Sequence, residues 1–281
     1  MAEEEIDAQQ DGIQEESEMT FWGHLEALRW HIIRSVSAVF IFAIAAFLNK
    51  DIIFKTIILA PKSSEFITNK LLCRLSEFLS LPSLCIGNFD LKLINIQMAG
   101  QFMIHMYISA FAGLIVAIPY VLWEIWRFVK PALHENEAHH ASGAVFFSSL
   151  LFLVGVLFSY FLIVPMAVLF LGSYTVSESV ENQVALSSYI STVVSLTFSV
   201  GVVFELPILV FFLTKVGMIT PMLMRRNRKF MIVVVLIVAA IITPPDVFSQ
   251  LLVTFPLLGL YELSILVSAR VYKRRSQEIS G

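Results

Sequence analysis

The stretch Phe204-Glu205-Leu206-Pro207 lies inside an apolar segment that runs from residue 184 to residue 213. Glu205 is the only charged residue of this segment, which exceeds the roughly 20 residues that a helix needs to cross a bilayer. A carboxyl group at such a depth is costly unless it is neutral, paired or hydrated. Glu205 is therefore predicted to be an intramembrane functional site. The alternative is a protonated side chain that only packs between helices.

Prolines predict where two of the long helices bend. Pro207 removes a backbone hydrogen-bond donor next to Glu205, so the helix is expected to kink there. Pro165 is expected to kink the preceding apolar segment, residues 141–171, in the same way.

The composition places the chain among membrane proteins. Of its 281 residues, 57% are hydrophobic and 15% are charged, with a mean hydropathy of +0.80. Soluble domains have about 45–50% apolar and about 25% charged residues. Together with several apolar runs of about 20 residues, these values predict an all-α polytopic membrane protein.

Six transmembrane helices are predicted, at residues 30–48, 102–123, 141–171, 184–213, 230–243 and 247–267. A short amphipathic helix over residues 21–29 is expected to lie at the membrane surface and to run straight into the first of them. The fifth segment is only about 21 Å long at 1.5 Å per residue, so helices 5 and 6 are predicted to be short and to form a hairpin.

The chain is predicted to have three parts. Residues 1–20 are expected to be an acidic, disordered cytoplasmic tail without the apolar core of a cleavable signal peptide. Residues 21–268 form the membrane domain, and residues 269–281 form a basic cytoplasmic tail.

The distribution of Lys and Arg predicts the orientation in the membrane. Positive charges in short links favour the cytoplasmic side. One topology puts every basic short link on the same side, and in it both termini are cytoplasmic. These basic links carry Arg29 with Arg34, Arg127 with Lys130, and the clusters at 225–229 and 270–275.

Residues 49–97 are predicted to be an external loop with a surface helix over residues 64–79. Both cysteines of the chain, Cys73 and Cys85, lie in this loop, which favours a disulfide in an oxidising compartment. Two unpaired buried thiols are the alternative.

The link after the second helix combines aromatic residues, a proline and two carboxylates over residues 123–137. Such a surface suits a cationic peptide, because carboxylates bind Arg in bidentate geometry. The alternative is a solvated loop with interfacial tryptophans. The two histidines at 134 and 139 are five residues apart, not the four that a zinc protease helix requires, so no metal site and no catalytic centre are predicted.

Four motifs resemble the TatC family, the twin-arginine protein translocase subunit. They are His24-Leu25-x-x-Leu28-Arg29, Phe128-x-x-Pro131-Ala-Leu with Glu137, Phe204-Glu205-x-Pro207, and Thr243-Pro-Pro-Asp246-Val-Phe-Ser-Gln250. The resemblance covers almost the whole chain after residue 20.

The resemblance implies a receptor in the bacterial cytoplasmic (inner) membrane that binds signal peptides with two consecutive arginines. It also implies single-helix partners of the TatA/TatB type, homo- and hetero-oligomers, and export of folded proteins driven by the proton-motive force. An enzyme, a cofactor and a nucleic-acid partner are not expected. By resemblance, the signal-peptide site comprises Arg29, Phe128, Pro131 and Glu137, and Glu26 is a further candidate for it. The partner-helix contacts are Thr243 and Gln250, and the matching residues of the external loops are Pro61 and Asp246.

Two positions depart from the family motif His-Leu-x-Glu-Leu-Arg-x-Arg. Ala27 stands where the family has Glu, and His31 stands where it has the second Arg. Glu26 is one residue earlier and points about 100° away on a helix. Recognition of the arginine pair is then expected to depend on Glu137, together with Glu124 or Glu135.

Two other functions remain open from the sequence. A proton-coupled small-solute transporter would use Glu205 as a relay. Against it, the helices show no internal repeat and only one deeply buried carboxylate is expected. A purely structural membrane scaffold would have no affinity for free signal peptides.

Overall fold

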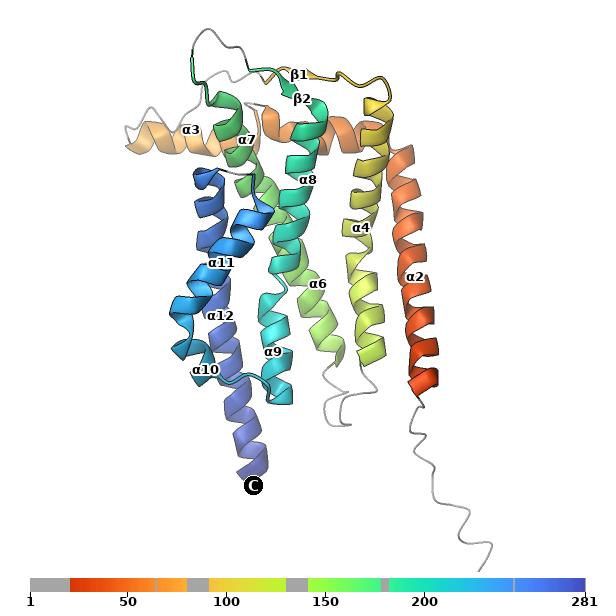
Figure 1. Ribbon diagram of the computed structural model, residues 1–281, viewed down its shortest axis with the longest axis vertical. Coiled ribbons are helices and arrows are strands. Elements are labelled where there is room, and N and C mark those ends of the chain that lie inside the picture. The colour runs from red at the N-terminus through yellow and green to blue at the C-terminus, as the bar shows by residue number, and fades with distance from the viewer. Residues whose placement is uncertain are drawn as a thin grey trace, which may run out of the picture.

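A computed structural model describes residues 21–63, 65–79, 91–129, 141–177, 182–244 and 246–280. These residues form a bundle of long helices with a horizontal helical arm across one end (Figure 1). The helices of the bundle are α2 (Phe21–Leu48), α4 (Gly100–Val129), α6 (Ala141–Phe158), α7 (Val164–Ser173), α8 (Leu186–Val203), α9 (Leu206–Val216), α10 (Pro221–Arg226), α11 (Arg228–Ile242) and α12 (Val247–Ser280).

Within the described residues, five stretches are long and apolar enough to cross a membrane, at Leu25–Leu48, Gly100–Val129, Val145–Ser173, Leu186–Val216 and Val247–Lys273. They correspond to five of the six predicted spans. The remaining one is α11, whose 15 residues agree with the short fifth helix expected from the sequence. The first residues of α2 and the last residues of α12 lie at the same end of the bundle, because α11 returns the chain to the opposite end before α12 begins (Figure 1).

Two boundaries differ from the sequence prediction. The second span does not end at Trp123, since α4 continues to Val129 and carries Glu124 and Phe128 on its last turns. The sixth helix is not short: α12 has 34 residues and continues through the basic segment after Val267. A fall in hydropathy marks where a span leaves the hydrocarbon, but Lys, Arg, Gln and Glu are good helix formers, so the helix does not end there.

Both helices are interrupted where the prolines predict. Between α8 and α9, the Glu205 N–H bonds to the carbonyl of Val202, one residue short of the α-helical pattern, and Pro207 follows two residues later. The π-helical segment η5 (Ser159–Ile163) separates α6 from α7 and ends two residues before Pro165. Each proline lacks the N–H that a continuous helix would use, and the distortion occurs in the turn before it.

Small residues bring the helices into close contact. A Cβ added to Gly113 of α4 would lie 2.4 Å from the backbone nitrogen of Ala43 on α2. The same test at Gly155 of α6 gives 2.7 Å to the ring of Phe204. Membrane helices commonly use small residues in this way, since close backbone approach maximises van der Waals contact.

The arm consists of the π-helix η1 (Ile52–Ile58), the 3-10 turn η2 (Ala60–Lys62) and the predicted surface helix α3 (Ile67–Leu79). Two tyrosines fix it to the bundle. The hydroxyl of Tyr160 donates to the carbonyl of Ile57 at 2.7 Å, and that of Tyr189 donates to the carbonyl of Ile58 at 2.8 Å. A parallel pair of two-residue strands, β1 (Leu93–Ile94) and β2 (Val184–Ala185), joins the segments that precede α4 and α8.

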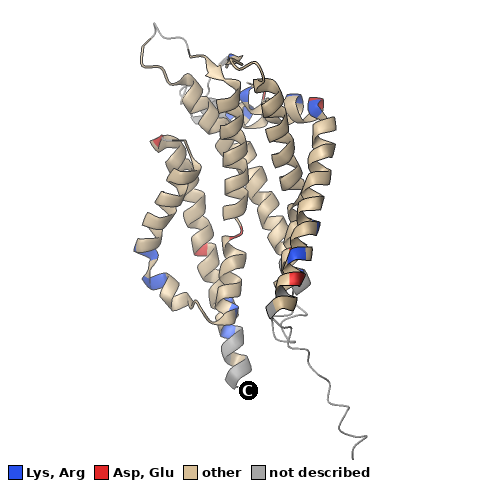
Figure 2. Cartoon of the chain, turned by 45° about the vertical axis from the view of Figure 1, so that its right-hand side comes forward, with Lys and Arg blue, Asp and Glu red and all other residues tan. Residues whose placement is uncertain are grey.

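The largest apolar core lies where η5, α7, α8 and α12 meet, with Ile163, Ile190, Leu196 and Val253 fully buried. Charged residues of the described chain gather towards the two ends of the helices, and few lie between (Figure 2). This separation is what a hydrocarbon layer around the middle of the bundle requires.

Candidate functional site

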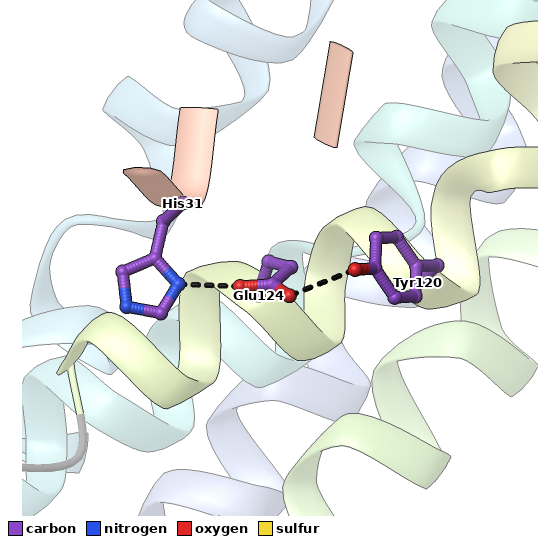
Figure 3. A network of polar contacts seen from close by, with 3 residues as sticks. All are labelled: His31, Tyr120 and Glu124. Carbon is purple, nitrogen blue, oxygen red and sulfur yellow. Dashed lines mark hydrogen bonds and ion pairs between the residues drawn. The ribbon is translucent and has the colours of Figure 1, made fainter. Parts of the chain in front are cut away.

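Three polar side chains meet where α2 begins and α4 ends (Figure 3). His31 of α2 bonds through Nδ1 to Oε2 of Glu124 on α4. The Tyr120 hydroxyl, one turn earlier on α4, donates to Oε1 of the same carboxylate at 2.9 Å. We call His31, Tyr120 and Glu124 the α2/α4 network.

Glu124 is the most deeply buried acidic side chain among the described residues, with 1% of its surface exposed. The expectation of a single deeply buried carboxylate at Glu205 is therefore wrong. Burial of a carboxylate is strongly unfavourable unless its oxygens are paired and hydrogen-bonded, and both oxygens of Glu124 have a partner. Glu124 thus holds α2 against α4 and is not an open carboxylate for an incoming peptide.

Phe128 lies one turn after Glu124 and contacts His31. The two rings meet edge to face, with centroids 5.9 Å apart and an angle of 65° between the ring planes. His31 is therefore held by Glu124 on one side and packs against Phe128 on another. The network sets the position of the aromatic ring at the end of α4.

Basic and aromatic side chains surround the network. Arg29 is exposed, with its guanidinium 5.8 Å from the ring centre of Trp30, and Glu26 is also exposed. A groove of about 390 Å³ beside the network is lined by Tyr120 and by residues of α2, which are Trp30, Ile33, Arg34, Ser37, Ala38 and Ile41. Glu26 is thus the accessible carboxylate that α2 offers at this end of the described chain.

The other predicted peptide-binding residues, Pro131 and Glu137, lie outside the described residues, as does Glu135. They follow Phe128 within the segment that joins α4 to α6. Their roles remain predictions.

Glu205 occupies the break between α8 and α9 and is half-buried. Its Oε2 accepts a hydrogen bond from the Ser148 hydroxyl of α6. Its Oε1 is buried and has no hydrogen-bond partner among the described residues. The carboxyl group lies between α6 and the α8/α9 junction.

Changing Glu205 to Gln is expected to leave the fold nearly intact, because the amide oxygen still accepts from Ser148. Glu205→Ala should lower stability by about 1–3 kcal/mol, since it leaves the Ser148 hydroxyl buried without a partner. Thermal unfolding measures both effects. Ser148→Ala, in the Glu205→Ala background, should restore part of the loss, because it removes the unpartnered hydroxyl. A double variant no more stable than Glu205→Ala would contradict this cause.

The residues predicted to contact a partner helix lie in the α11/α12 hairpin. Thr243 is buried, and its hydroxyl donates to the Ala239 carbonyl at 2.9 Å. The side-chain amide of Gln250 reaches across to the Leu236 carbonyl of α11 at 3.1 Å. Asp246 caps α12 by accepting from the Ser249 N–H at 2.6 Å.

In the segment predicted to be the first external loop, Pro61 is buried in η2 and Cys73 lies on α3. Cys85 lies outside the described residues, so the bridge between the two cysteines remains a prediction. In the described part of the chain, no three His, Cys, Asp or Glu side chains lie together as a metal site would require.

Sequence reasoning missed the α2/α4 network. One signal was present: Tyr120 and Glu124 are four residues apart and share a helix face. The other was His31 at a position where the family motif has Arg, but its partner could not be known before α2 was paired with α4.

Comparisons with known proteins identify the family of the chain. The family model described as "Sec-independent protein translocase protein (TatC)" matches residues 23–256. The TatC protein of Blattabacterium sp. from Periplaneta americana is 37% identical over 93% of this chain and 99% of its own length. That of Listeria innocua is 35% identical over 66% of this chain and 74% of its own length.

A crystal structure described as the twin-arginine translocase receptor TatC superimposes with a TM-score of 0.66. It is 32% identical and covers 87% of this chain and 97% of the solved one. The long apolar helices, the break at Glu205 and these relatives lead to one conclusion: the chain belongs to the TatC family of Sec-independent protein translocase components.

Proposed function

We propose that this protein is the receptor subunit of a twin-arginine translocase in the bacterial cytoplasmic membrane. It binds signal peptides that carry two consecutive arginines. It then recruits single-helix subunits of the TatA/TatB type, with which folded proteins are exported at the expense of the proton-motive force.

The observation that carries the proposal is the placement of Phe128. Its ring packs on His31 at the end of α4, and the acidic segment with Glu135 and Glu137 follows directly in the sequence. An arginine pair needs carboxylates for bidentate hydrogen bonds and an apolar or aromatic surface for the flat face of each guanidinium. Both oxygens of Glu124 already bond to His31 and Tyr120. We therefore assign the peptide's arginines to Glu137 and Glu26.

The distribution of charge supports a cytoplasmic position for this end. The beginning of α2, the end of α4, α10 and the end of α12 lie at the same end of the bundle (Figure 1). Their basic residues favour the cytoplasm. Six spans with both termini inside follow if α11 crosses a locally thinned bilayer.

The partner helix is assigned to α11. One face of this helix carries large apolar side chains that no described residue covers, including Phe230, Val233, Ile237 and Ile241. A single apolar helix laid along this face would bury them and would lie beside the hairpin that carries Thr243 and Gln250.

The direct test is binding of a synthetic signal peptide to the purified protein. Replacing the Arg-Arg pair with Lys-Lys should weaken binding by roughly 10- to 100-fold, since a hydrogen bond to a charged group contributes about 1.5–3 kcal/mol. Glu137→Gln should weaken the Arg-Arg peptide by a similar factor and leave the Lys-Lys peptide almost unchanged.

The matched control is Glu178→Gln, in the link before α8, which should bind both peptides like the wild type. Equal affinity for the two peptides would contradict the receptor proposal.

A small-solute transporter has weaker support. Among the described residues, Ser148 is the one side chain that bonds to the Glu205 carboxyl group, and no series of titratable groups leads away from it.

A further inference from the structure

A cavity of about 570 Å³ has part of η1 in its wall. The arm that contains η1 crosses the end of the bundle opposite to the α2/α4 network (Figure 1). The walls of the cavity come from α2, η1, α4, α6, η5 and α8. Its floor is buried, with Ile108 and Val193 only 1% and 2% exposed. Phe42, Val116 and Leu157 line it but are largely exposed, so the cavity opens sideways between α2, α4 and α6.

The lining is almost entirely apolar. Tyr160 and Thr197 are the only lining residues with a side-chain oxygen. The Tyr160 hydroxyl already donates to the Ile57 carbonyl, which leaves the buried Thr197 hydroxyl as the one unpartnered polar group of the lining. A polar solute would find no set of hydrogen-bond partners here, and apolar cavities of even about 150 Å³ stay free of water.

The size of the cavity distinguishes between two remaining candidate occupants, a transmembrane helix and a lipid acyl chain. One turn of a helix, about 10 Å across and 5.4 Å long, already fills roughly 420 Å³, so a transmembrane helix of a partner or of a second copy does not fit. If a methylene group takes about the ~30 Å³ share of a water molecule, the cavity has room for on the order of 15–20 of them. That is the size of one fatty-acyl chain.

Positive charge lies above the cavity. Ile53 and Ile57 of η1 form part of its wall, and Lys50 and Lys55 are exposed on the same short segment. Lys55 Nζ lies 3.0 Å from Asp51, and its hydrogen bond and charge hold the pKa of Asp51 below its usual value. With two ammonium groups and one carboxylate, the segment has a net positive charge that complements a phosphate at headgroup depth.

We propose that this cavity binds one acyl chain of a membrane phospholipid, whose phosphate lies against Lys50 at the surface above η1. The chain enters through the lateral opening between α2, α4 and α6. It fills the space that would otherwise separate α2 from α6 and α8, so the lipid acts as a structural part of the bundle.

Native mass spectrometry of the protein in mild detergent tests the proposal, with dipalmitoyl phosphatidylglycerol as the probe. The wild type should retain one lipid in a saturable way. Ala112→Phe, which fills the cavity from α4, should reduce that occupancy at least ten-fold. Ala110→Phe is the matched control, because Ala110 is exposed on the same helix and does not line the cavity, and it should bind like the wild type.

Two further variants and a thermal-unfolding measurement keep the test valid if Ala112→Phe misfolds. Ala45→Phe fills the cavity from α2 and should give the same loss, and Lys50→Glu should weaken retention of the anionic lipid without abolishing it. Added lipid should raise the thermal midpoint of the wild type but not of the two cavity-filling variants. Lipid adducts that do not saturate, or that are equal in Ala112→Phe and Ala110→Phe, would show annular lipid only and overturn the proposal.

Discussion

Replacing His31 with leucine is expected to destabilise the protein by about 3 kcal/mol, the upper part of the range found when a buried polar group loses a hydrogen-bond partner. Glu124 is 1% exposed and would keep only the Tyr120 hydroxyl as a partner. Equilibrium unfolding in mixed micelles, followed by the fluorescence of the buried Trp126, measures the loss.

Three further variants identify the cause of this loss. Tyr120→Phe should cost less, about 1–2 kcal/mol, because His31 still pairs with the carboxylate. The double variant His31→Leu with Glu124→Leu should recover most of the stability, since buried pairs are often replaced by apolar residues without cost. Val36→Leu, at an exposed position of α2, should stay within about 0.5 kcal/mol of the wild type. A His31→Leu variant as stable as Val36→Leu would contradict the role assigned to the network.

Replacing Gly113 with leucine is expected to separate α2 from α4 at a cost of about 3 kcal/mol or more. The new Cβ would lie 2.4 Å from the backbone nitrogen and 2.6 Å from the Cα of Ala43, so a backbone has to move. The α2/α4 network depends on the same helix pair. Binding of the Arg-Arg peptide should therefore fall together with stability, and both are measured on the purified variant.

Gly259→Leu is the matched control for this substitution. Gly259 lies within α12, where nothing approaches an added Cβ within 4 Å. Its replacement should be neutral or slightly stabilising, because glycine is a poor helix former. If Gly113→Leu unfolds no earlier than Gly259→Leu, the close packing of α2 on α4 is not important for stability.

Hydropathy and proline positions were sufficient to predict most of the fold. The five long spans, the short α11 and the breaks before Pro165 and Pro207 follow from the apolar segments and from the missing proline donor. The lengths of α4 and α12 did not follow. Both helices continue past the apolar segment into residues that are polar but helix-forming, and hydropathy is insensitive to that property.

The candidate site could be predicted only in part. The family motifs indicated Phe128 and Arg29 as site residues, and the structure places Phe128 against His31. The motifs gave no reason to connect His31 with Glu124, because the two residues are 93 positions apart and meet only when α2 packs on α4. The imidazole at the position of the family's second Arg is held by the buried carboxylate of Glu124 on α4.

Photo-crosslinking of a signal peptide to α4 tests the central claim most directly. A benzophenone-bearing phenylalanine analogue is placed at position 128 or, as the control, at position 102, which is an exposed phenylalanine near the other end of α4. The account predicts a crosslink from position 128 to an Arg-Arg peptide, a strong reduction with the Lys-Lys peptide, and none from position 102. Equal crosslinking of both peptides at position 128, or crosslinking from position 102 alone, would contradict the receptor function.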